Sequence, residues 1–376
     1  MTSFDDIRPY QDEEIPIAMQ RLADNKDLPA ILSRILPDAD TETIKARIRS
    51  INNSDQFQSE LMVKAVEGIM QKTASSFSWS GIENISDKRP CLFVSNHRDI
   101  VLDAMLLQYI LLTNGHKTCY IAFGNNLMFN PLFVDFWKVN KMFQIGRGGH
   151  PKDFYNSLLH MSEYIRHLIT EEHESVWIAQ RNGRTKDGLD STDPTILKMF
   201  GMSQRDDRVF SLSELNIVPV TVSYEWEPCD KMKTLECYAK QLNGSYEKQP
   251  DEDLNSVLTG ITQQKGYVHF HISPAITTKD LESLNDCVLA DFYKKVAQLI
   301  DNRIYTNYRL YPNNYIAHDL RSGTETYAHR YSDEEKAWFL QYMRWIDQCQ
   351  DMDHSVLKSV FLGIYANPID SLNNSK

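Results

Sequence analysis

One histidine stands where a general base could work. His97 directly follows the predicted strand 91–96 (CLFVSN) and precedes a predicted helix. The dipole at a helix N-terminus favours the neutral imidazole that a general base needs. Asp99 and Asp103 both lie close enough in the sequence to orient the ring and to stabilise its protonated form. A plainer alternative is also open on these residues, namely an exposed histidine beside a helix-capping Asn96 or Asp99.

A second loop that could do chemistry surrounds Arg147. It follows the predicted strand 141–146 (KMFQIG), glycines flank the arginine, and Pro151 suits the first position of a following helix. A guanidinium beside free backbone N–H groups suits a phosphate or a carboxylate. An ordinary tight turn with a solvated arginine explains the same residues and is favoured when this loop is taken alone.

The third loop follows the predicted strand 175–180 (SVWIAQ) and holds Arg181, Arg184 and Lys186 among two glycines. Three cations directly after a strand could clamp a phosphate. The alternative is a solvated charged loop, which nearby aspartates support because they offset part of the charge.

No motif in the sequence points to a metal or an organic cofactor. His269 and His271 share one face of a predicted strand, but no third ligand accompanies them, so half-exposed sheet histidines are favoured over a metal site. The sequence has no Gly-x-Ser-x-Gly elbow, Walker loop, Gly-x-Gly-x-x-Gly fingerprint or His-Glu-x-x-His motif.

The elements around these loops predict an α/β fold with a mixed, largely parallel sheet. Strands are predicted over 91–96, 118–124, 141–146, 175–180, 216–225 and 267–273, and helices between them over 103–112, 130–139, 154–169 and 194–200. Open sheets of this kind bind ligands at the carboxyl ends of their strands, where all three loops lie. We expect an N-terminal helical segment (1–75), an α/β domain (76–310) and a C-terminal helical segment (311–376).

The composition excludes several classes of protein. The 376 residues are 42% hydrophobic and 24% charged, which argues against disordered, collagen-like and disulfide-scaffold chains. A net charge of −11 argues against a nucleic-acid binder. The cysteines form no Cys-x-x-Cys pair, the N-terminus is acidic, and no apolar run approaches roughly 18 residues. We therefore expect a cytoplasmic protein without a signal peptide or a spanning helix.

Four segments, in order, resemble the conserved blocks of the glycerolipid acyltransferases, the glycerol-phosphate and 1-acylglycerol-phosphate acyltransferases. They are SNHRDIVLDA, FQIGRGG, WIAQRNGRTKDG and IVPVTVSYE, and the resemblance covers roughly residues 76 to 240. Two blocks depart from the family pattern. Five residues instead of four separate His97 from Asp103, and in the third block Asn182 replaces a glutamate while the arginine shifts to Arg184.

The resemblance implies a site as well as a fold. It makes His97 the general base, with Asp103 as its partner and Asp99 as the fallback. The acceptor phosphate would be bound by Arg98, Arg147, Arg181, Arg184 and Lys186, and the acyl-donor side would hold Asn182, Gly183 and Pro219. The implied reaction moves an acyl group from acyl-CoA or acyl carrier protein to a glycerol-phosphate hydroxyl, without metal or cofactor. The changed third block leaves open another acceptor, such as an amino-acid lipid. The longer spacing leaves open a non-catalytic lipid- or carrier-binding protein.

Membrane contact is a separate expectation. Residues 130–143 (NPLFVDFWKVNKMF) combine aromatic side chains with two lysines, a composition found in helices at membrane interfaces. An amphipathic helix that covers the sheet is favoured for this segment, and residues 15–36 are a second membrane candidate. The sequence thus predicts peripheral attachment at the cytoplasmic face of a membrane.

Overall fold

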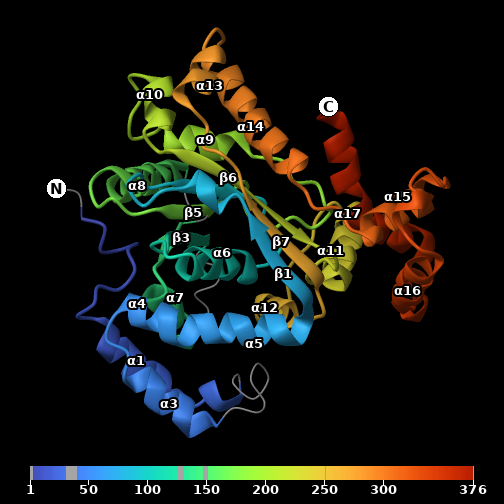
Figure 1. Ribbon diagram of the computed structural model, residues 1–376, viewed down its shortest axis with the longest axis horizontal. Coiled ribbons are helices and arrows are strands. Elements are labelled where there is room, and N and C mark those ends of the chain that lie inside the picture. The colour runs from blue at the N-terminus through green and yellow to red at the C-terminus, as the bar shows by residue number, and fades with distance from the viewer. Residues whose placement is uncertain (1–2, 31–39, 125–130, 147–150, 250, 376) are drawn as a thin grey trace.

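The computed structural model describes residues 3–30, 40–124, 131–146, 151–249 and 251–375 (Figure 1). The described residues form a seven-stranded sheet in the order β1-β7-β6-β2-β5-β3-β4. Its strands are β1 (Ala74–Ser80), β2 (Leu92–Ser95), β3 (Tyr120–Gly124), β4 (Met142–Ile145), β5 (Val176–Ala179), β6 (Ile217–Tyr224) and β7 (Gly266–Ile272). All neighbours pair in parallel except β6 and β7. The predicted α/β class with a mixed, largely parallel sheet is confirmed.

Six of the strands correspond to the six predicted from the sequence, whereas β1 is not predicted. Four of the seven residues of its sequence, ASSFSWS, are serine, and it lacks the apolar run that marks the other strands. In β5, Val176 and Ile178 pack on one face of the sheet while Trp177 packs on the other. This alternation gives the sheet two apolar faces, so helices must cover both.

On one side of the sheet lie the helices that precede β1, those that follow β2 and β3, and the helix that precedes β7 (Figure 1). They are α1 (Ile15–Asp24), α3 (Thr41–Arg49), α4 (Ser54–Gln56), the π-helix η1 (Phe57–Met62), α5 (Val63–Thr73), α6 (Leu102–Thr113), α7 (Pro131–Val139) and α12 (Glu252–Thr262). Of residues 15–36, the second membrane candidate, those from 31 onward lie outside the described residues. The favoured interpretation of 130–143 matches what is observed, since Phe133, Trp137 and Phe143 are all buried.

The opposite face and the end of the sheet carry the remaining helices. The opposite face packs against α8 (Pro151–Thr170), α9 (Pro194–Phe200), α10 (Arg208–Ser213), α13 (Thr278–Ser283) and α14 (Leu289–Thr306). A third apolar cluster joins α11 (Asp230–Asn243), α15 (Pro312–Ser322), α16 (Asp333–Met343) and α17 (His354–Asn374). Short 3-10 turns are η2 (Ile82–Asn84), η4 (Ala328–Arg330) and η5 (Arg344–Gln348). No helix in the described part of the chain has the length and hydropathy needed to cross a bilayer.

The loop after β5 is packed against the C-terminal helix α17. The Asn367 side chain donates a hydrogen bond to the Asp187 carbonyl at 2.7 Å. Gly188 has φ +80°, and a β-carbon there would lie 2.2 Å from the carbonyl oxygen of Ile364. The absence of a side chain at Gly188 therefore permits the close approach of loop and helix.

We predict that Gly188→Ala destabilises the protein more than Gly183→Ala, by about 1–3 kcal/mol. Both glycines have positive φ, but a β-carbon at Gly183 meets nothing within 4 Å. Gly183→Ala therefore reports the backbone strain alone. The difference between the two losses of unfolding free energy measures the contact of residue 188 with α17. Urea unfolding of both variants checks this, and equal losses of unfolding free energy would contradict the packing described.

Candidate active site

His97 and Asp103 form a hydrogen-bonded pair at the carboxyl end of β2. The imidazole Nδ1 lies 2.9 Å from Asp103 Oδ2, and the Tyr224 hydroxyl donates to Asp103 Oδ1 at 2.8 Å. The rings of His97 and Trp177 pack edge to face, with centroids 5.5 Å apart and planes at 73°. Because a carboxylate accepts a proton from Nδ1, Nε2 carries the lone pair. The arrangement is that of an oriented general base.

The Asp103 carboxylate also fixes the backbone that follows His97. Its Oδ2 accepts the amides of Arg98 and Asp99, at 2.6 and 2.9 Å. Burial opposes ionisation of Asp103, but the hydrogen bonds, above all the one from His97, lower the pKa of this carboxyl overall. Asp103 thus stays ionised where it can stabilise an imidazolium.

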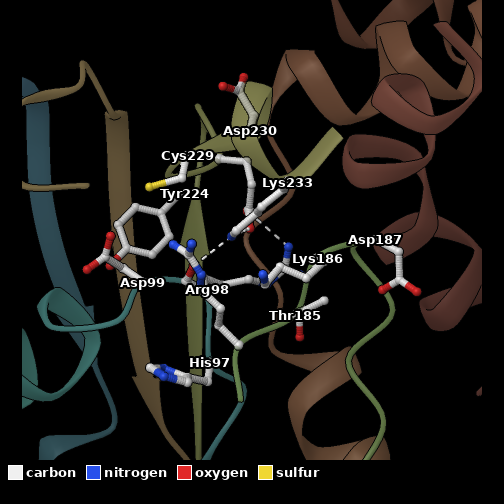
Figure 2. A network of polar contacts seen from close by, with 12 residues as sticks. His97, Arg98, Asp99, Thr185, Lys186, Asp187, Tyr224, Cys229, Asp230 and Lys233 are labelled. Carbon is white, nitrogen blue, oxygen red and sulfur yellow. Dashed lines mark hydrogen bonds and ion pairs between the residues drawn. The ribbon is translucent and has the colours of Figure 1, made fainter. Parts of the chain in front are cut away.

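The extra residue between His97 and Asp103 is absorbed before α6 begins. Asp99 is fully buried, and its Oδ1 accepts the amides of Val101 and Leu102 at 2.9 and 2.8 Å. In Figure 2 its carboxylate points away from the His97 ring. The structure therefore brings Asp103 to the histidine and uses Asp99 as a cap for the turn.

His97 lines a cavity of about 970 Å³ at the carboxyl ends of β2, β3, β4 and β5. Part of the wall is apolar and includes Met105, Phe123, Trp137, Met142 and Leu158. Part of it is cationic and includes Arg181, Arg184, Lys186, Lys198, Arg205, Lys240 and Lys248. One space thus combines a base, an apolar surface for a hydrocarbon chain and cations for phosphate.

The loop after β5 supplies much of the cationic wall, as the sequence predicts. The Arg184 guanidinium donates to Ser256 Oγ at 2.8 Å, and Arg181 donates to a backbone carbonyl at 3.2 Å. Lys186 contacts Glu236 on α11. Burial and the charge of Arg184 lower the pKa of Lys186 to about 8, although Glu236 opposes the shift.

The other predicted site residues do not all line the cavity. Asn182 and Gly183 also line the cavity, whereas Pro219 is buried within β6, between β2 and β7. Arg147 lies outside the described residues. Lys198 of α9, Lys240 of α11 and Lys248 of the loop between α11 and α12 were not identified from the sequence, because no motif marks them and only the fold brings them to the cavity.

Arg98 does not reach the cavity, contrary to the predicted phosphate-binding role. Its guanidinium is buried and pairs with Asp190 at 2.5 Å and Glu227 at 3.0 Å. Lys233 pairs with the same glutamate and donates to the Arg98 carbonyl, both at 2.6 Å. In Figure 2 the His97 ring lies apart from Arg98 and Lys233. Two cations and two carboxylates thus balance one another beneath the site.

The two histidines of β7 take part in hydrogen bonds with serines of β1. Ser78 and Ser80 contact His269 at 2.8 and 3.1 Å, and Ser80 contacts His271 at 2.9 Å. Burial lowers the pKa of His269 to about 4. Within the described residues no group of three or more His, Cys, Asp or Glu side chains could hold a metal ion.

We predict that Lys233→Met costs about 3–5 kcal/mol of unfolding free energy, because Glu227 and the Arg98 carbonyl lose a buried donor. Lys240→Met is the matched control, since Lys240 is half exposed and pairs with Glu236. The control should cost about 1 kcal/mol or less. Chemical denaturation measures both, and equal losses would show that the buried cluster is not a stability determinant.

The family model described as Acyltransferase matches residues 76–222. A curated glycerol-3-phosphate acyltransferase of Alteromonas mediterranea is 29% identical over 224 residues, or 55% of this chain and 25% of that protein. The chain thus spans about a quarter of the length of that relative. The crystal structure of the 1-acyl-sn-glycerophosphate (LPA) acyltransferase PlsC from Thermotoga maritima has a TM-score of 0.38 at 12% identity, over 76% of this chain and 95% of that chain.

Proposed function

We propose that this chain, whose residues 76–222 match the Acyltransferase family model, is an O-acyltransferase of the glycerolipid acyltransferase family. It transfers a fatty acyl group from acyl-CoA or acyl carrier protein to a hydroxyl of glycerol-3-phosphate or 1-acylglycerol-3-phosphate. The observation that carries the proposal is the His97–Asp103 pair, 2.9 Å apart, in a cavity with apolar and cationic walls.

The proposed reaction needs no covalent enzyme intermediate. The acceptor hydroxyl gives its proton to His97 Nε2 while its oxygen attacks the thioester carbonyl. Asp103 stabilises the imidazolium that forms, as its lowered pKa allows. The tetrahedral intermediate then expels the thiolate, which takes the proton back from the imidazolium. Both substrates are held in one cavity, so positioning contributes much of the rate.

Binding roles follow from the walls of the cavity. Arg181, Arg184 and Lys186 would hold the acceptor phosphate, and the resemblance adds Arg147. Asn182 and Gly183 would lie on the donor side. Pro219 is buried in β6, so it would affect the acyl-donor side only indirectly, through the packing of the sheet.

We predict that His97→Gln lowers the acylation rate roughly a hundred- to ten-thousand-fold, because the general base is lost. Asp103→Asn should lower kcat by a similar order, since the amide cannot stabilise the imidazolium. Initial rates with labelled acyl-CoA and glycerol-3-phosphate measure both.

The control for this prediction is His116→Gln. His116 Nδ1 also lies 2.9 Å from a carboxylate, that of Asp87, but this pair lies outside the cavity. Its loss should leave the rate unchanged. Wild-type turnover by His97→Gln would remove His97 as the base.

Two alternative functions, acylation of another acceptor and non-catalytic carrier binding, can be tested against the proposed one. A panel of acceptors that includes amino-acid lipids, offered with acyl-CoA and with acyl carrier protein, separates acceptor classes and donors. Acylation of every acceptor except glycerol phosphates would refute the acceptor proposed here. Binding of acyl thioester without any turnover would favour a non-catalytic carrier-binding protein.

Peripheral membrane attachment is proposed at the mouth of the cavity. The mouth rim, which we define as Phe154, Tyr155 and Leu289, lines the cavity with side chains that are 40%, 44% and 51% exposed. The exposed Arg205 packs over the Tyr155 ring at 5.7 Å. Apolar side chains beside cations are typical of membrane-interface surfaces. By contrast, α7 buries Phe133 and Trp137, and α1 buries Ile15, Met19 and Leu22. Location on the cytoplasmic face stays a prediction from the sequence.

We predict that the double change Phe154→Ser and Leu289→Ser weakens binding to anionic phospholipid vesicles on the order of tenfold or more, because two apolar anchors are lost. Trp338→Ser is the control, since Trp338 is 69% exposed on α16, away from the cavity. Vesicle co-sedimentation at low and high salt measures the effect. Unchanged binding by the double variant would refute attachment through the rim.

A further inference from the structure

Asp99 satisfies only one of its two carboxylate oxygens. Oδ1 caps the turn before α6, as described above, while Oδ2 is buried with no hydrogen-bond partner among the described residues. Oδ2 faces α12 at Gly260, where a β-carbon would lie 1.9 Å from it. A buried carboxylate oxygen without a donor is costly unless a positive charge lies near it.

Arg184 presents the complementary feature. Its Nη2 donates to Ser256 Oγ at 2.8 Å, while Nη1 is buried with no partner in the described part of the chain. Ser256 and Gly260 are four residues apart in α12, so they lie on the same face of that helix, one turn apart. Asp99 and Arg184 thus rest on neighbouring turns of one helix face.

The buried lysines near Asp99, Lys233 and Lys265, already have acceptors for their N–H groups. Lys265 Nζ donates to Thr73 Oγ1 and to the carbonyls of Ile261 and Gln263. Lys233 Nζ is committed to Glu227 and to the Arg98 carbonyl. Arg184 therefore has the unused donor that matches the unused oxygen of Asp99.

The electrostatics of the two groups agree with this pairing. Burial and the charge of Asp103 raise the pKa of Asp99, while the amides of Leu102 and Val101 and the charge of Arg184 oppose the rise. Burial disfavours the charged form of Arg184, but Cys229 and Asp99 raise the pKa of the guanidinium overall. Each charge thus stabilises the other.

We propose that Asp99 is a positioning residue for Arg184, whose guanidinium it holds over α12 in the orientation that receives the acceptor phosphate. The inference rests on the proposed function, because it takes Arg184 as part of the acceptor site. It gives Asp99 a role in acceptor binding, distinct from that of Asp103, which acts on His97. It also makes α12, beyond the matched residues 76–222, part of the acceptor site.

The first test is Asp99→Asn. The amide keeps an oxygen to cap the turn but carries no charge and turns an NH₂ group toward Arg184. We expect KM for glycerol-3-phosphate to rise roughly tenfold, with KM for acyl-CoA unchanged. We expect kcat to fall far less than in Asp103→Asn. Calorimetric titration with glycerol-3-phosphate should show the same weakening without turnover.

The second test is Gly260→Ala, which leaves every charge in place. In a helix interior this change normally stabilises a protein by about 1 kcal/mol. Here the methyl group would displace Asp99 Oδ2, so KM for the acceptor should again rise. Gly363→Ala in α17 is the control, because its nearest neighbour would be 3.7 Å away, and it should leave KM unchanged.

The outcomes separate this inference from the proposed function. A kcat loss in Asp99→Asn equal to that in Asp103→Asn would make Asp99 a partner of His97 and overturn the inference. If KM and affinity for the acceptor are unchanged in both variants, Asp99 only caps the turn before α6, and the inference is again overturned. A wild-type protein that acylates none of the glycerol-phosphate acceptors would instead overturn the proposed function.

Discussion

Asp190 can be buried completely because side chains from several parts of the chain donate hydrogen bonds to it. Asn96, Arg98, Thr185 and Tyr308 contact its carboxylate at distances of 2.5 to 3.0 Å. These donors come from the end of β2, the loop after β5 and the segment after α14. A buried carboxylate with this many donors is stable, but each donor is then held in one place. The same interaction therefore brings together the segments that surround His97.

The path of the backbone at His97 follows from this packing. The Thr185 amide donates to the His97 carbonyl at 2.7 Å, and Lys233 holds the next carbonyl. Asp103 takes the two following amides, so the chain between β2 and α6 has little freedom. A general base gains rate only when it is held within hydrogen-bond reach of its substrate. Asp99, Asp103 and Asp190 near His97 thus differ in how their carboxylate oxygens are hydrogen-bonded, and that difference gives each a separate role.

The sequence predicts the sheet and much of the cavity wall because these depend on local patterns. Apolar runs mark β2 to β7, and polar loops at their ends must meet at one edge of a parallel sheet. It misplaces Arg98, which adjoins His97 in the chain but pairs with carboxylates 92 and 129 residues away. Tyr224 and Trp177 are missed for the same reason, since each reads as an ordinary strand residue. Long-range pairing of polar side chains leaves no periodic signal in a single sequence.

The C-terminal helices extend the buried network rather than merely flank it. The Glu227 amide donates to the Tyr365 hydroxyl at 3.2 Å, and that hydroxyl donates to Asp230 at 2.6 Å. Glu227 in turn pairs with Arg98, the residue next to His97. Without the Tyr365 hydroxyl of α17, the buried Asp230 would lose a donor, and its pKa, which burial already raises, would rise further. Buried polar contacts therefore connect residues beyond the matched family segment to the residue next to His97.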